Sequence, residues 1–103
     1  MTIYVMLMHQ ISDVEKYYSD YAPGTMELIL KHGGEILVSS PEAKPLMGEP
    51  PNGAVILRFP TEEAALAFMT DPDYQDLAAL RMSITSNQNA VIAPEIDLST
   101  LEG

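Results

Sequence analysis

The order of apolar and polar residues along the chain predicts an alternation of short strands and amphipathic helices. Between residues 12 and 32, and again between 61 and 81, apolar side chains recur every three or four positions, which is the period of a helix with one buried face. Short apolar runs flank these segments and have the length of strands. The predicted strands are 2–9, 35–39, 54–59 and 88–93. The predicted order is therefore strand, helix, strand, strand, helix and strand, with the second helical segment divided in two.

Capping residues divide the second helical segment. Thr61 follows an apolar run and a proline, and its hydroxyl can accept a hydrogen bond from the first helical turn. Asp71-Pro72 then ends this helix and begins another, with Asp71 as the cap and Pro72 at the first helical position. Tyr74 and Arg81 are seven residues apart, so they share one face of the second helix.

The first helical segment contains an irregularity of its own. Pro23 removes one backbone hydrogen bond from the helix, which predicts a kink or a break after Tyr21. Gly33-Gly34 is expected to end the segment, because a glycine can take the left-handed conformation that closes a helix. The connection Ser40–Gly53 holds four prolines and two glycines, a composition typical of an irregular and mobile lid or rim.

The first strand is apolar on both of its faces. Alternate residues of a strand point to opposite sides of the sheet. Ile3, Val5 and Leu7 occupy one side, and Tyr4, Met6 and Met8 occupy the other. Such a strand is expected at the centre of its sheet, with both faces covered. Because the helices of so short a chain can cover only one face, a second copy of the chain is expected on the other, as a homodimer.

This order of elements predicts an α+β, ferredoxin-like fold. In the βαββαβ arrangement, one antiparallel sheet carries its helices on a single face, and the free faces of two chains can meet to form a dimeric α/β barrel. The chain has 103 residues and is expected to form a single domain over residues 1–96, followed by an acidic tail over 97–103.

Composition and charge narrow the classes of function. Fifteen acidic and five basic residues give a net charge of −10, which argues against nucleic acid and anionic membranes as partners. The chain has no cysteine, so a disulfide framework, a thiolate nucleophile and a cysteine-bound metal are excluded. No apolar run reaches the roughly 20 residues of a membrane span, and the apolar start lacks the basic leader of a signal peptide. We therefore expect a cytoplasmic protein.

Arg58 is the most unusual residue of the pattern, because it places a charge inside an otherwise apolar strand. Burying such a charge is costly unless it is paired. A hairpin between the two middle strands would bring Glu35 close to it, which predicts a structural ion pair. Alternatively, Arg58 faces a barrel cavity and orients a carboxylate or enolate oxygen of a substrate.

The histidines and tyrosines are the other candidates for chemistry. His9 and His32 can act as a general acid or base, or they can be structural residues at the ends of elements. Without carboxylates at a suitable spacing, they predict no metal site. Tyrosines at helical spacing, and Arg81 beside them, can frame a pocket or can be ordinary core residues. The tyrosines are Tyr17, Tyr18, Tyr21 and Tyr74. The candidate catalytic residues are His9, Arg58 and Tyr74, and the candidate substrate-binding residues are Tyr21, His32 and Arg81.

Six short motifs follow one another along the chain. They are His9–Asp13, Pro23 within a tyrosine-rich helix, His32-Gly33-Gly34, Phe59-Pro60-Thr61-x-Glu63-Ala64-Ala65, Asp71-Pro72-Asp73-Tyr74-Gln75 and Leu80-Arg81. In their order and spacing the chain resembles the family catalogued as domain of unknown function thirteen-thirty, within the dimeric α/β-barrel superfamily. The resemblance implies the fold and the dimer but no reaction. Glu35, Ser39 and Arg58 depart from the family, which usually has basic residues at the first two positions and an acidic residue at the third.

Two classes of function follow. The chain contains no phosphate-binding glycine loop, nucleotide fingerprint or Ser-His-Asp order, so any catalysis is expected to need no cofactor. The first is a small enzyme of isomerase, cyclase or oxygenase type that transfers a proton on a small oxygen-bearing metabolite, and only the resemblance to the wider superfamily supports it. The alternative is a non-catalytic dimeric module that binds a small-molecule ligand or has a structural role. A closed, packed barrel would favour the module, and a cavity lined by His9, Arg58 and Tyr74 would favour the enzyme.

Overall fold

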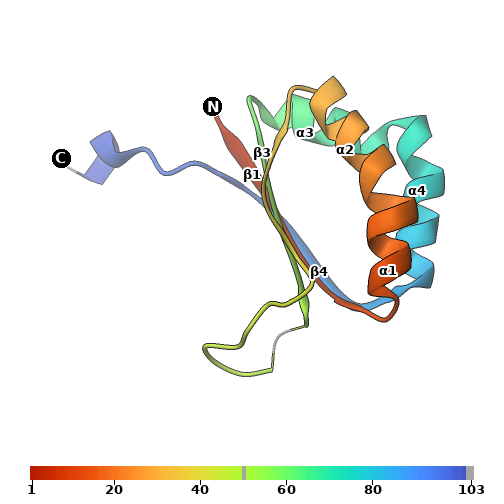
Figure 1. Ribbon diagram of the computed structural model, residues 1–103. Coiled ribbons are helices and arrows are strands. Elements are labelled where there is room, and N and C mark those ends of the chain that lie inside the picture. The colour runs from red at the N-terminus through yellow and green to blue at the C-terminus, as the bar shows by residue number, and fades with distance from the viewer. Residues whose placement is uncertain (50, 102–103) are drawn as a thin grey trace.

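The computed structural model describes residues 1–49 and 51–101 and consists of one sheet with helices on a single face (Figure 1). The elements are β1 (Ile3–Ile11), α1 (Val14–Lys16), the π-helical turn η1 (Tyr17–Tyr21), α2 (Ala22–Lys31), β2 (Glu35–Ser40), β3 (Gly53–Phe59), α3 (Glu62–Thr70), α4 (Pro72–Ser83), β4 (Thr85–Pro94) and the 3₁₀ turn η2 (Leu98–Leu101). The last two residues of the tail expected over 97–103 lie outside the described residues. None of the helices in the described ranges has both the length and the apolar character that crossing a bilayer requires.

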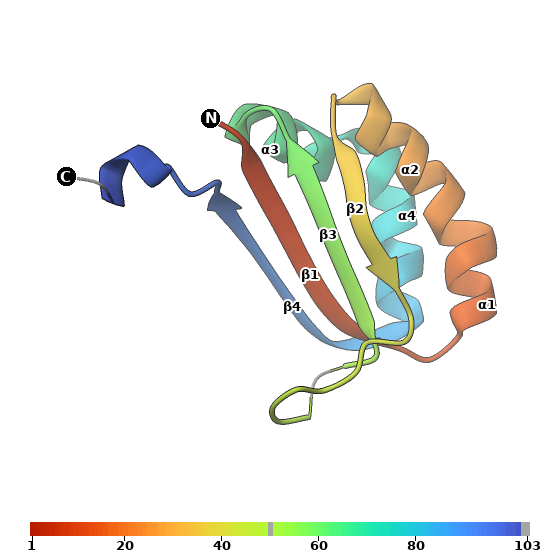
Figure 2. The same cartoon turned by 60° about the vertical axis from the view of Figure 1, so that its left-hand side comes forward.

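The sheet is antiparallel throughout, with the strand order β2-β3-β1-β4 (Figure 2). This is the ferredoxin-like arrangement, so the predicted fold class is confirmed. β1 occupies a central position, as its two apolar faces predicted. β1 extends to Ile11 and β4 begins at Thr85 rather than at Gln88, because the backbone ladder between them continues beyond the apolar residues that the pattern detects.

The predicted helix caps of the second helical segment are present. The Thr61 hydroxyl accepts a hydrogen bond from the Ala64 N–H at 3.0 Å. The Asp71 carboxylate accepts one from the Asp73 N–H at 2.9 Å. Each cap satisfies a backbone donor that has no partner within its own helix. Helices α3 and α4 therefore begin where the sequence predicted.

The irregularity expected near Pro23 is a π-helical turn rather than a break. In η1 the Ala22 N–H bonds to the carbonyl of Tyr17, one residue further back than in an α-helix. Pro23 then occupies the first turn of α2, where its missing N–H costs little. The helical segment therefore continues from α1 through α2, and Tyr17 and Tyr21 are both buried.

Helix α2 ends in the predicted glycine cap. Gly33 has a φ of +80°, a left-handed conformation that glycine adopts without strain. The N–H groups of Gly33 and Gly34 bond to the carbonyls of Leu30 and Ile29 at 3.0 and 2.8 Å. These are the two bonds of a Schellman motif. The chain therefore turns directly from α2 into β2.

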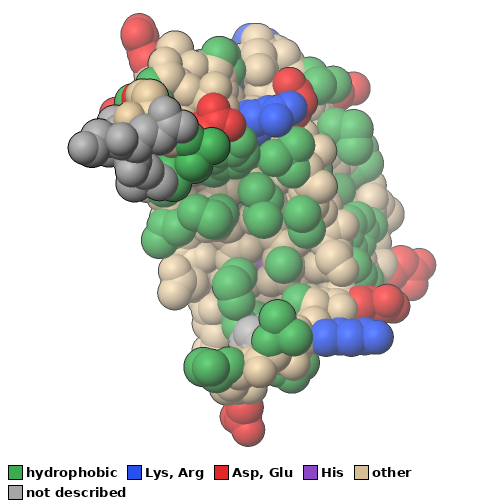
Figure 3. Space-filling view, turned by 90° about the vertical axis from the view of Figure 1, so that its left-hand side faces the viewer, with side chains coloured by type: hydrophobic (Ala, Val, Ile, Leu, Met, Phe, Trp, Pro, Cys, Tyr) green, Lys and Arg blue, Asp and Glu red, His purple; other side chains and the backbone are tan. Residues whose placement is uncertain are grey.

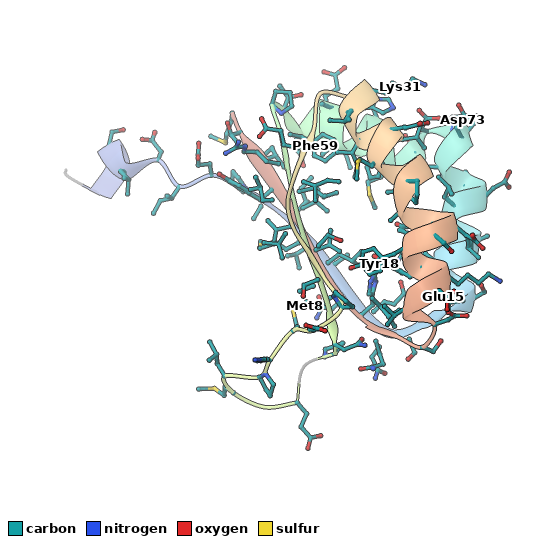
Figure 4. All side chains as sticks on the ribbon, in the orientation of Figure 1. Met8, Glu15, Tyr18, Lys31, Phe59 and Asp73 are labelled. Carbon is teal, nitrogen blue, oxygen red and sulfur yellow. The ribbon has the colours of Figure 1, made fainter. Side chains whose placement is uncertain are left out.

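The core lies between the sheet and the helices. Phe59 and Phe68 are at most 1% exposed, and their rings stack with centroids 5.7 Å apart. Phe59 lies on the helix side of the sheet and Met8 on the opposite side (Figure 4). On that opposite side, which we call the free face, Met6, Met8 and Val91 are 36–50% exposed. Figure 3 shows apolar side chains spread over the free face.

Candidate functional site

A pocket of about 600 Å³ lies between the sheet and the helices. Ligand pockets in proteins are typically roughly 300–1,000 Å³, so this one is large enough for a small metabolite. Its lining is mostly apolar. The polar or polar-tipped side chains in it are Tyr17, Tyr18, Tyr21, Thr25, Ser39, Tyr74, Arg81 and Gln88. The pocket is formed by one chain alone, whereas the sequence left open either a packed two-chain barrel or a cavity within it.

Tyr21 and Tyr74 form a hydrogen-bonded pair in the pocket wall. Their hydroxyl oxygens are 2.6 Å apart, and each residue is 4% exposed. Burial, together with the neighbouring Tyr74, raises the pKa of Tyr21 well above its usual range. Tyr21 therefore stays a hydrogen-bond donor at every physiological pH. Because only one hydrogen lies between the two oxygens, the second hydroxyl hydrogen of the pair can be donated to another group.

His9 adjoins the pocket without lining it. The residue is fully buried, and its Nε2 lies 3.1 Å from the hydroxyl of Tyr17, which does line the pocket. Gly53 lies opposite on β3, where a Cβ would approach His9 Cδ2 to 2.8 Å, so glycine leaves room for the ring. Burial, and secondarily the charge of Arg81, lowers the pKa of His9 to about 4. The ring is therefore neutral at pH 7 and reaches the pocket through Tyr17.

Arg81 carries a positive charge at the pocket. Its side chain extends from α4, and its Nη1 donates a hydrogen bond to Gln88 Oε1. Gln88 can accept this bond because β4 bulges at this point. The register of β4 against β1 shifts between Met8 and Gln10, and Asn87 has a φ of +51°. Such bulges are common beside functional sites, where they redirect a side chain.

Three buried side-chain atoms lack a hydrogen-bond partner among the described residues: His9 Nδ1, Thr25 Oγ1 and Arg81 Nε. Thr25 and Arg81 line the pocket, and His9 contacts Tyr17 in its wall. Buried polar atoms without partners are uncommon in folded proteins, and each one requires an explanation. Two of these atoms belong to residues that line the pocket, so the pocket contains polar groups that no described residue pairs.

Arg58 lies on the free face, away from the pocket. Its Nη2 donates to Glu35 Oε2 at 2.5 Å, so the predicted ion pair is confirmed. On β3 the flanking residues Leu57 and Phe59 point toward the helices, and alternation along the strand directs Arg58 to the other side. Within the described chain, Arg58 therefore shares no cavity with His9 and Tyr74, the arrangement that would have favoured the enzyme, because it lies on the opposite face of the sheet.

His32 is likewise outside the pocket. Its Nε2 lies 2.8 Å from the Asp71 carboxylate, at the junction of α3 and α4, and Lys31 Nζ approaches the same oxygen at 3.2 Å. The hydrogen bond from His32, then that from the Asp73 N–H, lowers the pKa of Asp71 to about 2. This cluster joins α2 to the helix junction and has a structural character. Within the described ranges, no three His, Asp or Glu side chains are placed to hold a metal ion.

Comparison with models of known protein families assigns this chain to a family. The family model described as Domain of unknown function (DUF1330) matches residues 2–96. The chain belongs to the DUF1330 family. This confirms the family that the six sequence motifs indicated. No match was found among curated proteins.

Solved structures share the fold of this DUF1330 chain at low sequence identity. A protein of unknown function from Rhodopseudomonas palustris is 13% identical, with a TM-score of 0.76 over 93% of this chain and 83% of that one. A dimeric ferredoxin-like protein of unknown function from Thermobifida fusca is 14% identical, with a TM-score of 0.57 over 92% of both chains. An antibiotic biosynthesis monooxygenase is 13% identical, with a TM-score of 0.52 over 94% of this chain and 100% of that one. These likenesses establish the fold alone.

The structure brings together four of the six candidate residues of this DUF1330 chain. Tyr21, Tyr74 and Arg81 line the pocket, and His9 adjoins it. Gln88 was not among the candidates. No local signal marks it, because its position depends on the bulge that forms when β4 pairs with β1.

Proposed function

We propose that the pocket binds a small, largely apolar, oxygen-bearing metabolite and that the protein catalyses a proton transfer on it without a cofactor. The observation that carries the proposal is the combination, in one pocket, of an apolar lining with the buried donors of Tyr21, Tyr74 and Arg81. The reaction class is isomerase, cyclase or oxygenase. The shared fold with an antibiotic biosynthesis monooxygenase supports including an oxygenase among these classes.

The donors are suited to a developing negative charge. When a carbon next to a carbonyl loses a proton, the charge moves to the carbonyl oxygen as an enolate. The free hydrogen of the Tyr21–Tyr74 pair and the guanidinium of Arg81 can both bind that oxygen. In a mostly apolar pocket such interactions are stronger than in water, and the groups are already in place.

The pair of Tyr17 and His9 supplies a route for the proton. In the tautomer with hydrogen on Nδ1, His9 Nε2 accepts the hydroxyl hydrogen of Tyr17 across their 3.1 Å contact. The Tyr17 oxygen takes the substrate proton in the same step, which leaves an enolate in the pocket and an imidazolium at His9. The charge of Arg81 is one of the two causes of the low pKa of His9. The negative charge of the enolate offsets the charge of Arg81 and so helps His9 to hold the proton.

Deuterium exchange tests the proton transfer without knowledge of the natural substrate. A panel of compact apolar ketones, including 2-tetralone, is incubated with the protein in D₂O, and incorporation next to the carbonyl is followed by NMR. We expect exchange above the buffer rate, with at least a tenfold loss in Tyr74→Phe and in His9→Gln, as is usual for removal of a general acid or base. Arg58→Met is the matched control and should exchange at the native rate. Exchange at the buffer rate for every ketone would contradict catalysis.

A non-catalytic ligand-binding module is the second candidate. It is favoured by the burial of His9 behind Tyr17 and by the mutual hydrogen bond of Tyr21 and Tyr74, which is also what a packed core would contain. The same experiment separates the two candidates. A binding module would shift the tyrosine ring signals when a ketone is added and would leave its deuterium exchange at the buffer rate.

We also infer that the chain acts as a homodimer joined through the free face. Met6, Met8 and Val91 expose apolar surface there that no described residue covers. The β2–β3 connection and the C-terminal tail extend on the same side of the sheet, opposite the helices (Figure 1). Leu46 in the connection is fully exposed, and Ile96 in the tail is 65% exposed. The Thermobifida fusca neighbour is described as dimeric, which supports the same assembly here.

Light scattering at micromolar concentration tests the dimer. We expect the mass of two chains for the native protein and of one chain for Met6→Asp, because the substitution places a charge in an apolar interface. Leu66→Asp is the control, since Leu66 is 50% exposed on the helix layer and should leave the mass unchanged. A single-chain mass for the folded native protein would contradict the dimer.

A further inference from the structure

Arg81 is partly buried and forms no ion pair with any described acidic residue. The ion pairs of the described residues join Lys31 and His32 to Asp71, and Arg58 to Glu35. The remaining lysines are exposed to solvent. Arg81 belongs to none of these pairs, and its hydrogen bond goes to the neutral amide of Gln88.

The free-energy cost of leaving a partly buried Arg81 without an acidic partner indicates that its side chain has a functional role. An arginine keeps its charge at any ordinary pH, so Arg81 cannot lower the cost of its partial burial by losing a proton. A charge in mostly apolar surroundings is destabilising unless it is paired. The chain has fifteen acidic residues, yet none forms an ion pair with Arg81 in the described part of the structure.

The geometry of the guanidinium shows where a counter-charge would bind. The Nη1 group of Arg81 donates its hydrogen bond to Gln88. Nε is buried without a partner, and Nη2 makes no hydrogen bond to any described residue. The edge formed by Nε and Nη2 can bind both oxygens of a carboxylate at once. Thr25, which also lines the pocket, adds a hydroxyl without a partner.

We propose that the natural ligand of the pocket is a compact apolar monoanion, whose carboxylate or acidic enol binds to the Nε–Nη2 edge of Arg81. This proposal rests on the proposed function, in that the pocket is a ligand site. Arg81 is the one basic side chain among the described residues of the lining, so a single negative charge on the ligand matches it. The rest of the ligand is apolar because the rest of the lining is.

Two probes with the same ring system test the charge preference. 1-Naphthoate carries one negative charge, and 1-naphthalenemethanol carries none. Titration calorimetry at about 0.15 M salt limits the long-range repulsion from the acidic protein. We expect naphthoate to bind at least about tenfold more tightly than the alcohol, because a charge-assisted pair is among the stronger polar contacts. In Arg81→Met this preference should disappear through weaker binding of naphthoate alone.

Matched variants show whether the guanidinium itself is responsible. Arg81→Lys keeps the charge but loses the two-donor edge, so its preference for naphthoate should be intermediate. Arg58→Met removes an arginine from the free face and should keep the native preference. Should Arg81→Met fail to fold, the NMR signal of the Arg81 Nε–H in the native chain provides the same information. It should shift with naphthoate and stay unchanged with the alcohol.

The outcomes separate this proposal from the proposed function. Equal binding of the two probes, or loss of the preference in Arg58→Met, would overturn the monoanion while leaving a ligand pocket in place. Catalysed exchange of neutral ketones without naphthoate binding would also overturn it and support the proposed function. If neither probe bound and no ketone exchanged, both would be contradicted.

Discussion

The two faces of the sheet are built from alternate residues of the same strands, yet they meet different surroundings. On β1, Val5 points toward the helices and is 7% exposed, while the next residue, Met6, points to the free face and is 36% exposed. Both faces are apolar. The helix face is covered by the chain itself and encloses a pocket, whereas none of the described segments covers the free face. The pocket is therefore a property of one chain, and the proposed dimer would use the opposite face.

The two faces also differ in how their arginines are paired. Arg58 on the free face is paired with Glu35. Arg81 on the helix face has no acidic partner in the described structure and lies in a pocket. We interpret the paired charge as structural and the unpaired one as a site for a ligand. The following predictions test this difference between the faces, from the largest expected effect to the smallest.

Removing a core aromatic should show how strongly the helix face is packed. Phe68→Ala leaves a cavity at a residue that is 1% exposed, so we expect a loss of about 3–5 kcal/mol in the free energy of unfolding by urea. Met6→Ala, measured at a protein concentration low enough to dissociate the proposed dimer, should cost much less, because Met6 is 36% exposed in the single chain. Equal losses would mean that the free face is packed as tightly as the helix face.

His9 should make stability depend on pH. Its pKa is lowered from 6.5 to about 4 in the fold, so the unfolded chain binds the proton at a higher pH than the native chain does. Stability should therefore fall as the pH drops from about 6.5 to about 4, by about 3 kcal/mol at roughly 1.4 kcal/mol per pKa unit. Asp71, with its pKa lowered to about 2, should affect stability only at lower pH.

The control is the difference between the native chain and His9→Gln, measured by urea unfolding at each pH. His9→Gln should lack the decline between pH 6.5 and 4, while effects of the many other acidic groups cancel in the comparison. A decline of the same size in both proteins would contradict a buried, neutral His9.

The hydroxyl pair in the pocket should behave as a unit. Tyr74→Phe leaves the Tyr21 hydroxyl buried without its partner, which should cost about 1–3 kcal/mol in the free energy of unfolding. Tyr21→Phe combined with Tyr74→Phe should cost less than the sum of the single changes, because no polar atom is then left unpaired. Chemical denaturation of the three variants measures this coupling, and strictly additive losses would argue against the bond.

The free-face ion pair should give the smallest effect. Arg58 and Glu35 have side chains that are 39% and 59% exposed, so water and salt screen their attraction. We expect the double variant Arg58→Met, Glu35→Gln to melt closer to the native temperature than either single variant, since no unpaired charge remains. Loss of naphthoate binding in Arg58→Met would contradict the assignment of this arginine to structure.

Local interactions explain why much of the fold could be predicted from the sequence. The caps at Thr61 and Asp71, the irregularity at Pro23 and the end of α2 at Gly33 depend on residues within a few positions of one another. The two apolar faces of β1 likewise required only alternation along one strand. The helical period also placed Tyr74 and Arg81 on the same side of α4, where both line the pocket.

Tertiary structure decided what depends on contacts between distant segments. Alternation alone could not tell which face of β3 would meet the helices, so the sequence left Arg58 open between an ion pair and a cavity. The contact of His9 with Tyr17 and of Tyr21 with Tyr74 required the helices to pack at a particular height on the sheet. Gln88 reached Arg81 only through a bulge in the pairing of β4 with β1. The sequence determined the local geometry of each element, and the packing of those elements determined which side chains share a pocket, because that packing joins residues far apart along the chain.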